Sequence, residues 1–305
     1  MCLSSGVSIG TNYPGISPNQ SRERWDLMDF NGQRALVTGA SSGIGEVFAR
    51  QLAERGANLV LAARSQDKLE ALAQELQGRF GTSVEVLACD LSVPGAGGAL
   101  AARLAEQDLR IDVLINAAGF GLFGQLHEVD PARTSQQVLL NVAAVTELTC
   151  ALLPQMRARN RGAIVNVAST AAFQPLPYMA AYGATKAYVL SFTEALWAET
   201  RGTEVRVTAL CPGATDTPFF DTASEHASIG HRMAPEDVVD AAFRALDRRR
   251  CSVTPGLRNR LLAGAPRLTP RQTVVRVSER TMRPKSSTGS VTVRQPSSSE
   301  AGGDA

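Results

Sequence analysis

Tyr182 and Lys186 are the residues whose types and spacing are best suited to chemistry. They stand four positions apart at the start of a helix-length segment, so their side chains project from one helix face, one turn apart. A phenol has a pKa of about 10, which an adjacent ammonium lowers. Reduction of a carbonyl by hydride transfer leaves an alkoxide, which needs a proton from a nearby acid. The pair is suited to that proton transfer.

Two further polar residues accompany the pair. Ser169 ends an apolar, strand-like run, and a loop that contains proline separates it from Tyr182. The chain has only three lysines and otherwise uses arginine for positive charge, which argues against an accidental spacing at Lys186. Asn141 lies within an expected helix, where asparagine is disfavoured. The alternative interpretation of Asn141 is that its side chain only forms a hydrogen bond with local backbone.

A glycine-rich turn separates the first expected strand from the first helix and reads Gly39-Ala-Ser-Ser-Gly43-Ile-Gly45. Glycines let the backbone approach a pyrophosphate, and the helix N-terminus supplies free N–H groups and a positive dipole end. The lysine and Ser/Thr of a kinase-type P-loop are missing after the second glycine. Glycine clusters also occur in surface turns, but this position predicts a dinucleotide site.

The end of the second expected strand indicates which nucleotide binds. NAD sites place a carboxylate there for the ribose 2′-hydroxyl, whereas this strand ends in Ala63-Arg64-Ser65, with no acid before Asp67. An arginine can hold a 2′-phosphate through two hydrogen bonds. A solvent-exposed arginine is the alternative interpretation. Together with the missing acid, Arg64 predicts NADP(H).

Apolar strands alternate with helix-length segments from residue 34 to about residue 255. This alternation indicates βαβ units, a parallel sheet covered on both faces and a single α/β domain with a Rossmann-type, doubly wound sheet. Helices are expected from the glycine turn through Arg55 and over 67–79. The expected strands are 35–38, 58–63, 84–88, 111–116, 163–168 and 205–210.

The composition is that of an ordinary folded protein. The net charge of +2 gives no reason to expect a nucleic-acid partner, and no apolar run approaches the ~20 residues of a membrane span. The N-terminus lacks the pattern of a signal peptide. Five scattered cysteines without a C-x-x-C pair argue against disulfides and metal sites, and Cys89 and Cys211 are expected to be buried. We therefore expect a cytoplasmic protein without a metal.

Composition also divides the chain into four segments. Residues 1–31 are expected to be a disordered extension, and we hypothesise that translation can start at Met28, which the intact mass of the native product would test. Residues 32–255 form the oxidoreductase domain, 256–284 a basic helical segment and 285–305 a disordered tail. The basic segment is expected to pack its apolar side on the domain or on a partner subunit, in preference to a membrane surface.

These motifs together resemble the short-chain dehydrogenases/reductases, over about residues 32 to 284. The matching pieces, in order, are Thr38-Gly-Ala-Ser-Ser-Gly-Ile-Gly45, Ala63-Arg64, Asp90, Asn116-Ala-Ala-Gly119, Asn141, Ser169, Tyr182-x-x-x-Lys186 and Pro212-Gly213. The family more often has Asn-Asn-Ala-Gly at 116–119. The resemblance implies a seven-stranded parallel sheet and a homodimer or homotetramer formed through the helices that carry Asn141 and Tyr182.

The resemblance also implies roles for residues. Tyr182 would be the general acid/base, and Lys186 would lower its pKa and bind the nicotinamide ribose. Ser169 would bind the substrate carbonyl, and Asn141 would hold a relay water. The stretch 212–217 would contact the nicotinamide. The expected cofactor-binding residues are Gly39, Ser41, Ser42, Gly43, Ile44, Gly45, Arg64, Asp90, Leu91, Asn116, Ala117, Gly119, Tyr182, Lys186, Pro212, Gly213, Thr215 and Thr217.

The substrate is expected to be a hydrophobic ketone, aldehyde or secondary alcohol. Nine apolar residues are expected near the nicotinamide, although they could equally be core or dimer contacts: Phe120, Leu122, Phe123, Phe173, Leu176, Tyr178, Met179, Phe219 and Phe220. His127, His226 and His231 are expected to be solvated. Two other functions remain open: a non-catalytic NADP-binding sensor or scaffold, and an enzyme resembling the nucleotide-sugar epimerases.

Overall fold

A seven-stranded parallel sheet forms the centre of the computed structural model, which describes residues 30–224 and 232–284. The strand order is β3-β2-β1-β4-β5-β6-β7, and each neighbouring pair is parallel. The chain therefore reverses its direction of winding between β1 and β4, as the doubly wound fold requires. The strands are β1 Arg34–Thr38, β2 Asn58–Ala63, β3 Val84–Ala88, β4 Val113–Asn116, β5 Gly162–Val167, β6 Val205–Leu210 and β7 Ser252–Val253.

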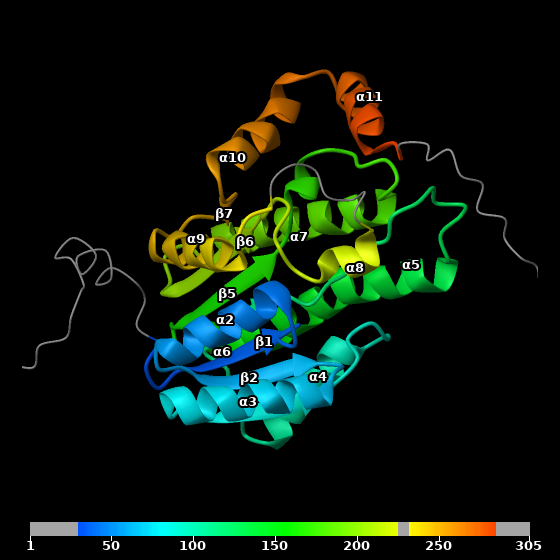
Figure 1. The fold of residues 1–305 in the computed structure, drawn as a ribbon. Coiled ribbons are helices and arrows are strands. Elements are labelled where there is room, and N and C mark those ends of the chain that lie inside the picture. Colours follow the sequence, from blue (N-terminus) through cyan, green and yellow to red (C-terminus); the bar gives the residue numbers. More distant parts are fainter. Residues whose placement is uncertain (1–29, 225–231, 285–305) are drawn as a thin grey trace, which may run out of the picture.

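Helices cover both faces of the sheet (Figure 1). Successive side chains of a strand point to opposite faces, so Ala35 and Val37 of β1 enter one core cluster and Leu36 enters the other. The first cluster includes residues of α2 (Gly43–Glu54), α3 (Gln66–Phe80) and α9 (Pro235–Asp247). The second includes residues of α4 (Ala96–Glu106), α6 (Val145–Ala158) and α7 (Ala180–Glu199).

The expected sheet is confirmed, with small differences at its margins. β2, β3 and β6 have the expected bounds, and the other expected strands shift by one or two residues at an end. The two-residue β7 is too short to leave a sequence pattern. Phe30 falls in the expected disordered extension but is fully buried, so that boundary is corrected. Residues 1–29, with Met28, and the expected tail lie outside the described residues.

One helical stretch is longer and more apolar than the sequence analysis allowed. Residues Pro131–Ala158 run as α5 (Pro131–Val138), a π-helical stretch η1 (Leu139–Ala144) and α6. By length and composition alone this stretch could cross a membrane, with a mean hydropathy of 1.4 in its most apolar window. A core helix meets the same criteria, and α6 packs its buried residues into the second core cluster.

Phe30 fastens the start of the described chain to the core. Its ring packs against the Phe243 ring of α9, with 5.5 Å between their centroids. Phe243 also contacts Phe48 of α2, so the three rings join α2, α9 and the chain start. We predict that Phe30→Ala lowers the free energy of unfolding by about 3–5 kcal/mol, because it leaves a cavity between packed rings. Urea unfolding measures the change.

Phe80→Ala in α3 is not a suitable control, since Phe80 is half-buried and packs partly against the same cluster. Val93→Ala is suitable, because Val93 is half exposed in a loop. A loss of stability at Phe30 no larger than that at Val93 would contradict the anchoring role.

Candidate active site

A cavity of about 570 Å³ opens at the carboxyl ends of the strands, around the point between β1 and β4 where the winding reverses. Ligands of doubly wound folds bind at this place. The cavity brings together eighteen of the twenty expected site residues: Gly39, Ser41, Ser42, Gly43, Ile44, Gly45, Arg64, Asp90, Leu91, Ala117, Gly119, Ser169, Tyr182, Lys186, Pro212, Gly213, Thr215 and Thr217. Asn116 and Asn141 lie behind its wall.

The glycine turn is built for close approach of the backbone. Gly39 has a φ of +70°, and a Cβ there would lie 2.8 Å from the Ala118 backbone. A Cβ at Gly45 would lie 2.3 Å from the Gly39 carbonyl oxygen, so only glycine fits. Ser42, the N-cap of α2, makes no side-chain capping bond, which leaves the first N–H groups of α2 available to an anion. This cradle fits the pyrophosphate of a dinucleotide.

Two cations line the cavity at the end of β2. Arg64 was expected there, but Lys68 in the first turn of α3 was missed. The signal was present, since Lys68 lies four residues after Arg64 and Asp67 drew attention as the nearest acid. Asp90 lies close by. Its burial raises the pKa, but hydrogen bonds from Ser92 outweigh that effect with help from Arg64, so the pKa lies below the ordinary value.

The Tyr182 hydroxyl is buried and lies near the Ser169 side chain. Burial raises the pKa of Tyr182 to about 12, and the nearby Ser169 side chain opposes this only in part. The sequence analysis expected Lys186 to lower this pKa. In the protein alone, loss of solvation dominates the pKa, and the expected lowering by Lys186 stays a prediction. The phenol is therefore protonated at neutral pH and can act as a proton donor.

The Lys186 ammonium is buried beside Tyr182, with Nζ 5.8 Å from the centre of the phenol ring. Nζ donates a hydrogen bond of 2.7 Å to the carbonyl oxygen of Val167, at the end of β5. Burial lowers the pKa of Lys186 to about 8, with a small opposing effect of Cys211. Cys211 is buried as expected, while Cys89 is half-buried and lines the cavity.

Asn141 and Asn116 support the site from within. Asn141 lies in η1, donates to the Phe120 carbonyl (3.0 Å) and accepts from the Phe120 N–H (3.2 Å). A Cβ on Gly119 would lie 3.0 Å from Asn141 Oδ1 and 3.5 Å from Lys186 Nζ, so these groups meet at the glycine. The Asn116 side chain donates to Asn166 in the sheet at 2.8 Å instead of lining the cavity. The expected relay water and cofactor contact of these two residues stay predictions.

One end of the cavity is apolar. Five of the nine expected apolar residues line it: Phe120, Leu176, Met179, Phe219 and Phe220. Phe219 belongs to α8 (Phe219–Ala223), and its ring lies 5.4 Å from the Tyr182 ring. Phe123 and Tyr178 stack on each other just behind. The cavity therefore places a proton donor against an apolar wall.

The C-terminal segment contributes to the same wall, which the sequence analysis missed. Asn259, Leu262 and Ala263 of α10 (Leu257–Gly264) line the cavity, as does Met282 at the end of α11 (Arg271–Met282). Met282 is buried in a cluster with Met179 and Tyr182. The intermittent leucines and arginines of this segment gave no signal for this contact. In Figure 1, α10 and α11 lie beyond the sheet at the top of the view.

Among the described residues, no histidine lines the cavity and no metal site is found. His127 is exposed beside Glu128, whereas His226 and His231 lie outside the described residues. Within residues 30–224 and 232–284, no group of three or more His, Cys, Asp or Glu side chains could hold a metal ion.

Comparisons with known proteins agree with this geometry. The family model for short chain dehydrogenase matches residues 33–228. A 7beta-hydroxysteroid dehydrogenase of Clostridium sardiniense is 33% identical over 222 residues, which cover 72% of this chain and 84% of that enzyme. The chain belongs to the short-chain dehydrogenase family.

Two solved structures are similar in fold and in sequence. A short-chain dehydrogenase from Sphingobium yanoikuyae in complex with NADPH is 38% identical, with a TM-score of 0.70 over 77% of this chain and 94% of that one. A bulky-bulky ketone specific alcohol dehydrogenase from Comamonas testosteroni is 34% identical, with a TM-score of 0.68 over 78% and 93%. The fold and site are thus those of an oxidoreductase of this family.

Lys186 makes the stability of the protein depend on pH in a defined window. Its folded pKa of about 8 lies below the ordinary value of 10.5, so between these values the unfolded chain binds more protons than the folded one. We predict that its unfavourable contribution is largest below pH 8 and is relieved toward pH 10.5, by about 1.4 kcal/mol per pH unit. Urea unfolding at pH 7 and 9.5 measures this.

Lys186→Met supplies the reference, because it lacks the titrating group and every other group titrates in both proteins. The free energy of unfolding of the wild type, minus that of the variant, should rise with pH. A difference that stays constant would show that the ammonium is not buried.

Proposed function

We propose that this protein uses NADPH to reduce a hydrophobic ketone or aldehyde to the alcohol. The observation that carries the proposal is the buried Tyr182 hydroxyl, beside Ser169, between an apolar wall and the glycine cradle. NADPH would lie along the cavity, with its pyrophosphate on the first turn of α2 and its 2′-phosphate between Arg64 and Lys68. The NADPH complex of a 38% identical relative supports this cofactor.

In this mechanism the side chains handle the carbonyl oxygen and its proton. The bound nicotinamide supplies the hydride. Ser169 and Tyr182 donate hydrogen bonds to the carbonyl oxygen, and Tyr182 transfers its proton as negative charge develops there. The Lys186 ammonium, held by Val167, stabilises the phenolate that remains. Because the pKa of Tyr182 is about 12, the phenol starts in the protonated form that reduction needs.

The apolar wall favours bulky substrates. Phe219, Phe220, Leu176 and Met282 offer surface to a large hydrophobic group but no charged partner. The relatives named for a bulky ketone and for a hydroxysteroid support this class. An oligomer formed through the helical stretches that carry Asn141 (η1) and Tyr182 (α7) stays a prediction, which light scattering measures. Val138, exposed at the end of α5 directly before η1, is a residue that it would cover.

Tyr182→Phe tests the function. We predict that the variant oxidises NADPH with hydrophobic ketones about 10²–10⁴-fold more slowly in kcat, since the proton donor is lost. NADPH binding, measured by its fluorescence, should not change. Initial rates over a panel of ketones of increasing bulk give both the class of substrate and the effect.

Tyr188→Phe is the matched control, because Tyr188 lies on the same helix, exposed and away from the cavity. If Tyr182→Phe kept full activity, the catalytic role would fail. If the wild type bound NADPH but reduced no carbonyl, the sensor or scaffold would be the better description.

Arg64 and Lys68 test the cofactor preference. We predict that Arg64→Ala and Lys68→Ala each raise the KM for NADPH about 10–100-fold, because each removes a charged hydrogen bond to the 2′-phosphate. The KM for NADH, which lacks that phosphate, should stay within a factor of two or so. Arg79→Ala, at the far end of α3, is the control. Equal losses with both nucleotides would contradict the assignment.

A further inference from the structure

A second cavity, of about 560 Å³, lies outside the active site between α9, β7 and α10. Exposed arginines line it from both sides of the gap, and among the described residues no aspartate or glutamate lines it. We term it the arginine groove. Its arginines are Arg244, Arg248, Arg250, Arg260 and Arg267.

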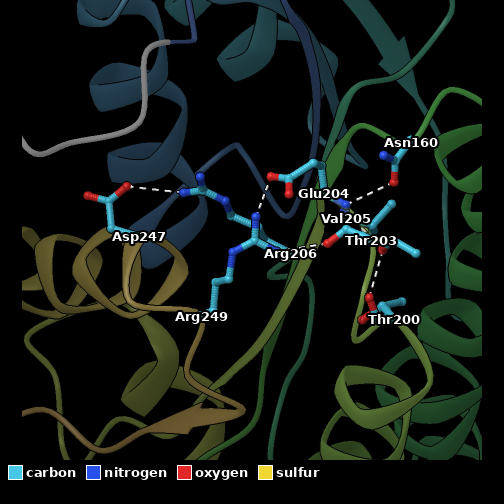
Figure 2. A network of polar contacts seen from close by, with 8 residues as sticks. All are labelled: Asn160, Thr200, Thr203, Glu204, Val205, Arg206, Asp247 and Arg249. Atoms are coloured by element: carbon cyan, nitrogen blue, oxygen red, sulfur yellow. Dashed lines mark hydrogen bonds and ion pairs between the residues drawn. The ribbon is translucent and has the colours of Figure 1, made fainter.

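The charge in the groove is not neutralised by the fold. Figure 2 shows that Arg206 and Arg249, close to the end of α9, pair with Asp247 and Glu204. By contrast, no described carboxylate forms an ion pair with the five groove arginines. Like charges gathered around a concave surface repel one another and attract an anion. Guanidinium groups bind phosphate oxygens particularly well.

Exposed leucines border the groove. Leu257, which also lines it, is 71% exposed, and Leu261 one helical turn later is 67% exposed. Leu268, at the end of the 3₁₀ turn η4 (Ala265–Leu268), is 92% exposed. The sequence analysis expected the apolar side of residues 256–284 to pack on the domain or on a partner subunit. The structure leaves these three leucines unpacked against the domain, and we term them the leucine rim.

We propose that the arginine groove and the leucine rim bind the surface of an anionic phospholipid membrane. The phosphates of the headgroups would contact the arginines, and the leucines would enter the boundary between headgroups and acyl chains. The two signals adjoin, because Arg260, Arg267 and the leucine rim lie in residues 256–284, which hold seven arginines and one glutamate. The other three groove arginines come from α9 and the turn after it. Basic residues interspersed with exposed leucines are typical of helices that lie on membranes.

A second copy of the chain fits this face poorly. A twofold axis through the groove would bring the five arginines opposite the same five arginines, and such like-charge contacts oppose association. A soluble phosphate compound would satisfy the arginines but would leave the leucine rim in water. The combination of charge and apolar surface therefore favours a lipid surface.

Helix α10 connects this surface to the catalytic cavity. Leu257, Arg260 and Gly264 of α10 line the groove, whereas Asn259 and Leu262 line the cavity. A protein bound through the groove would hold the apolar end of its cavity close to the lipid, where hydrophobic carbonyl compounds concentrate. This consequence rests on the proposed function, but lipid binding itself does not.

Vesicle flotation of the full chain without cofactor tests the proposal. We expect the wild type to float with vesicles of phosphatidylcholine and phosphatidylglycerol but not with phosphatidylcholine alone. Arg260→Glu/Arg267→Glu should lower the partition coefficient about tenfold or more. Arg79→Glu/Arg161→Glu, with the same change of charge on exposed sites elsewhere, should bind as the wild type does. Leu261→Ser/Leu268→Ser should remove the binding that survives high salt.

Thermal unfolding shows whether the variants fold, and Arg260→Gln/Arg267→Gln replaces the glutamate variant if that one does not. Absence of binding to either vesicle, or equal losses in the groove and control variants, would overturn the proposal. A smaller mass by light scattering in the groove variant would show an interface between copies instead. Stabilisation by inorganic phosphate without vesicle binding would show a soluble-anion site. None of these experiments measures enzymatic activity. A negative result would therefore contradict the lipid binding but not the proposed reductase function.

Discussion

The buried ammonium of Lys186 is the constraint on which the site depends. A charge removed from water must be held by a fixed polar group, and the Val167 carbonyl at 2.7 Å is that group. This bond ties α7 to the end of β5, two residues before Ser169. Tyr182, one turn before Lys186, is then brought to the Ser169 hydroxyl. Packing of a helix on a sheet, not a flexible loop, therefore positions the catalytic groups.

A chain of buried amides supports this arrangement beneath the cavity. Asn116 of β4 donates to Asn166 of β5 at 2.8 Å, and Asn166 donates to Thr193 of α7 at 3.0 Å. The Thr193 hydroxyl in turn donates a hydrogen bond to the Val189 carbonyl within α7. Each of these three side-chain donors has a partner, so the three elements keep one register. The asparagine that looked like a cofactor contact thus has a structural task as well.

The sequence predicted the fold well because its signals are local. Strands such as 58–63 and 205–210 are continuous apolar runs, and the glycine turn marks the point where β1 meets α2. The spacing of Tyr182 and Lys186 predicted their proximity but not their pKa values, because burial is a property of the whole domain. Lys68 and Met282 were missed for related reasons. Lys68 directly follows Asp67, which drew attention as the nearest acid. Met282 reaches the cavity only through the path that α10 and α11 take.

The position of Met282 late in the sequence also means that the parts of the cavity are synthesised in a defined order. The glycine cradle and the Tyr182–Lys186 pair are complete by residue 186, and the cavity-lining stretch 212–217 by residue 217. The last piece of the substrate wall lies near the C-terminus and leaves the ribosome after all of these. A nascent chain can therefore form its nucleotide cradle before its substrate wall exists.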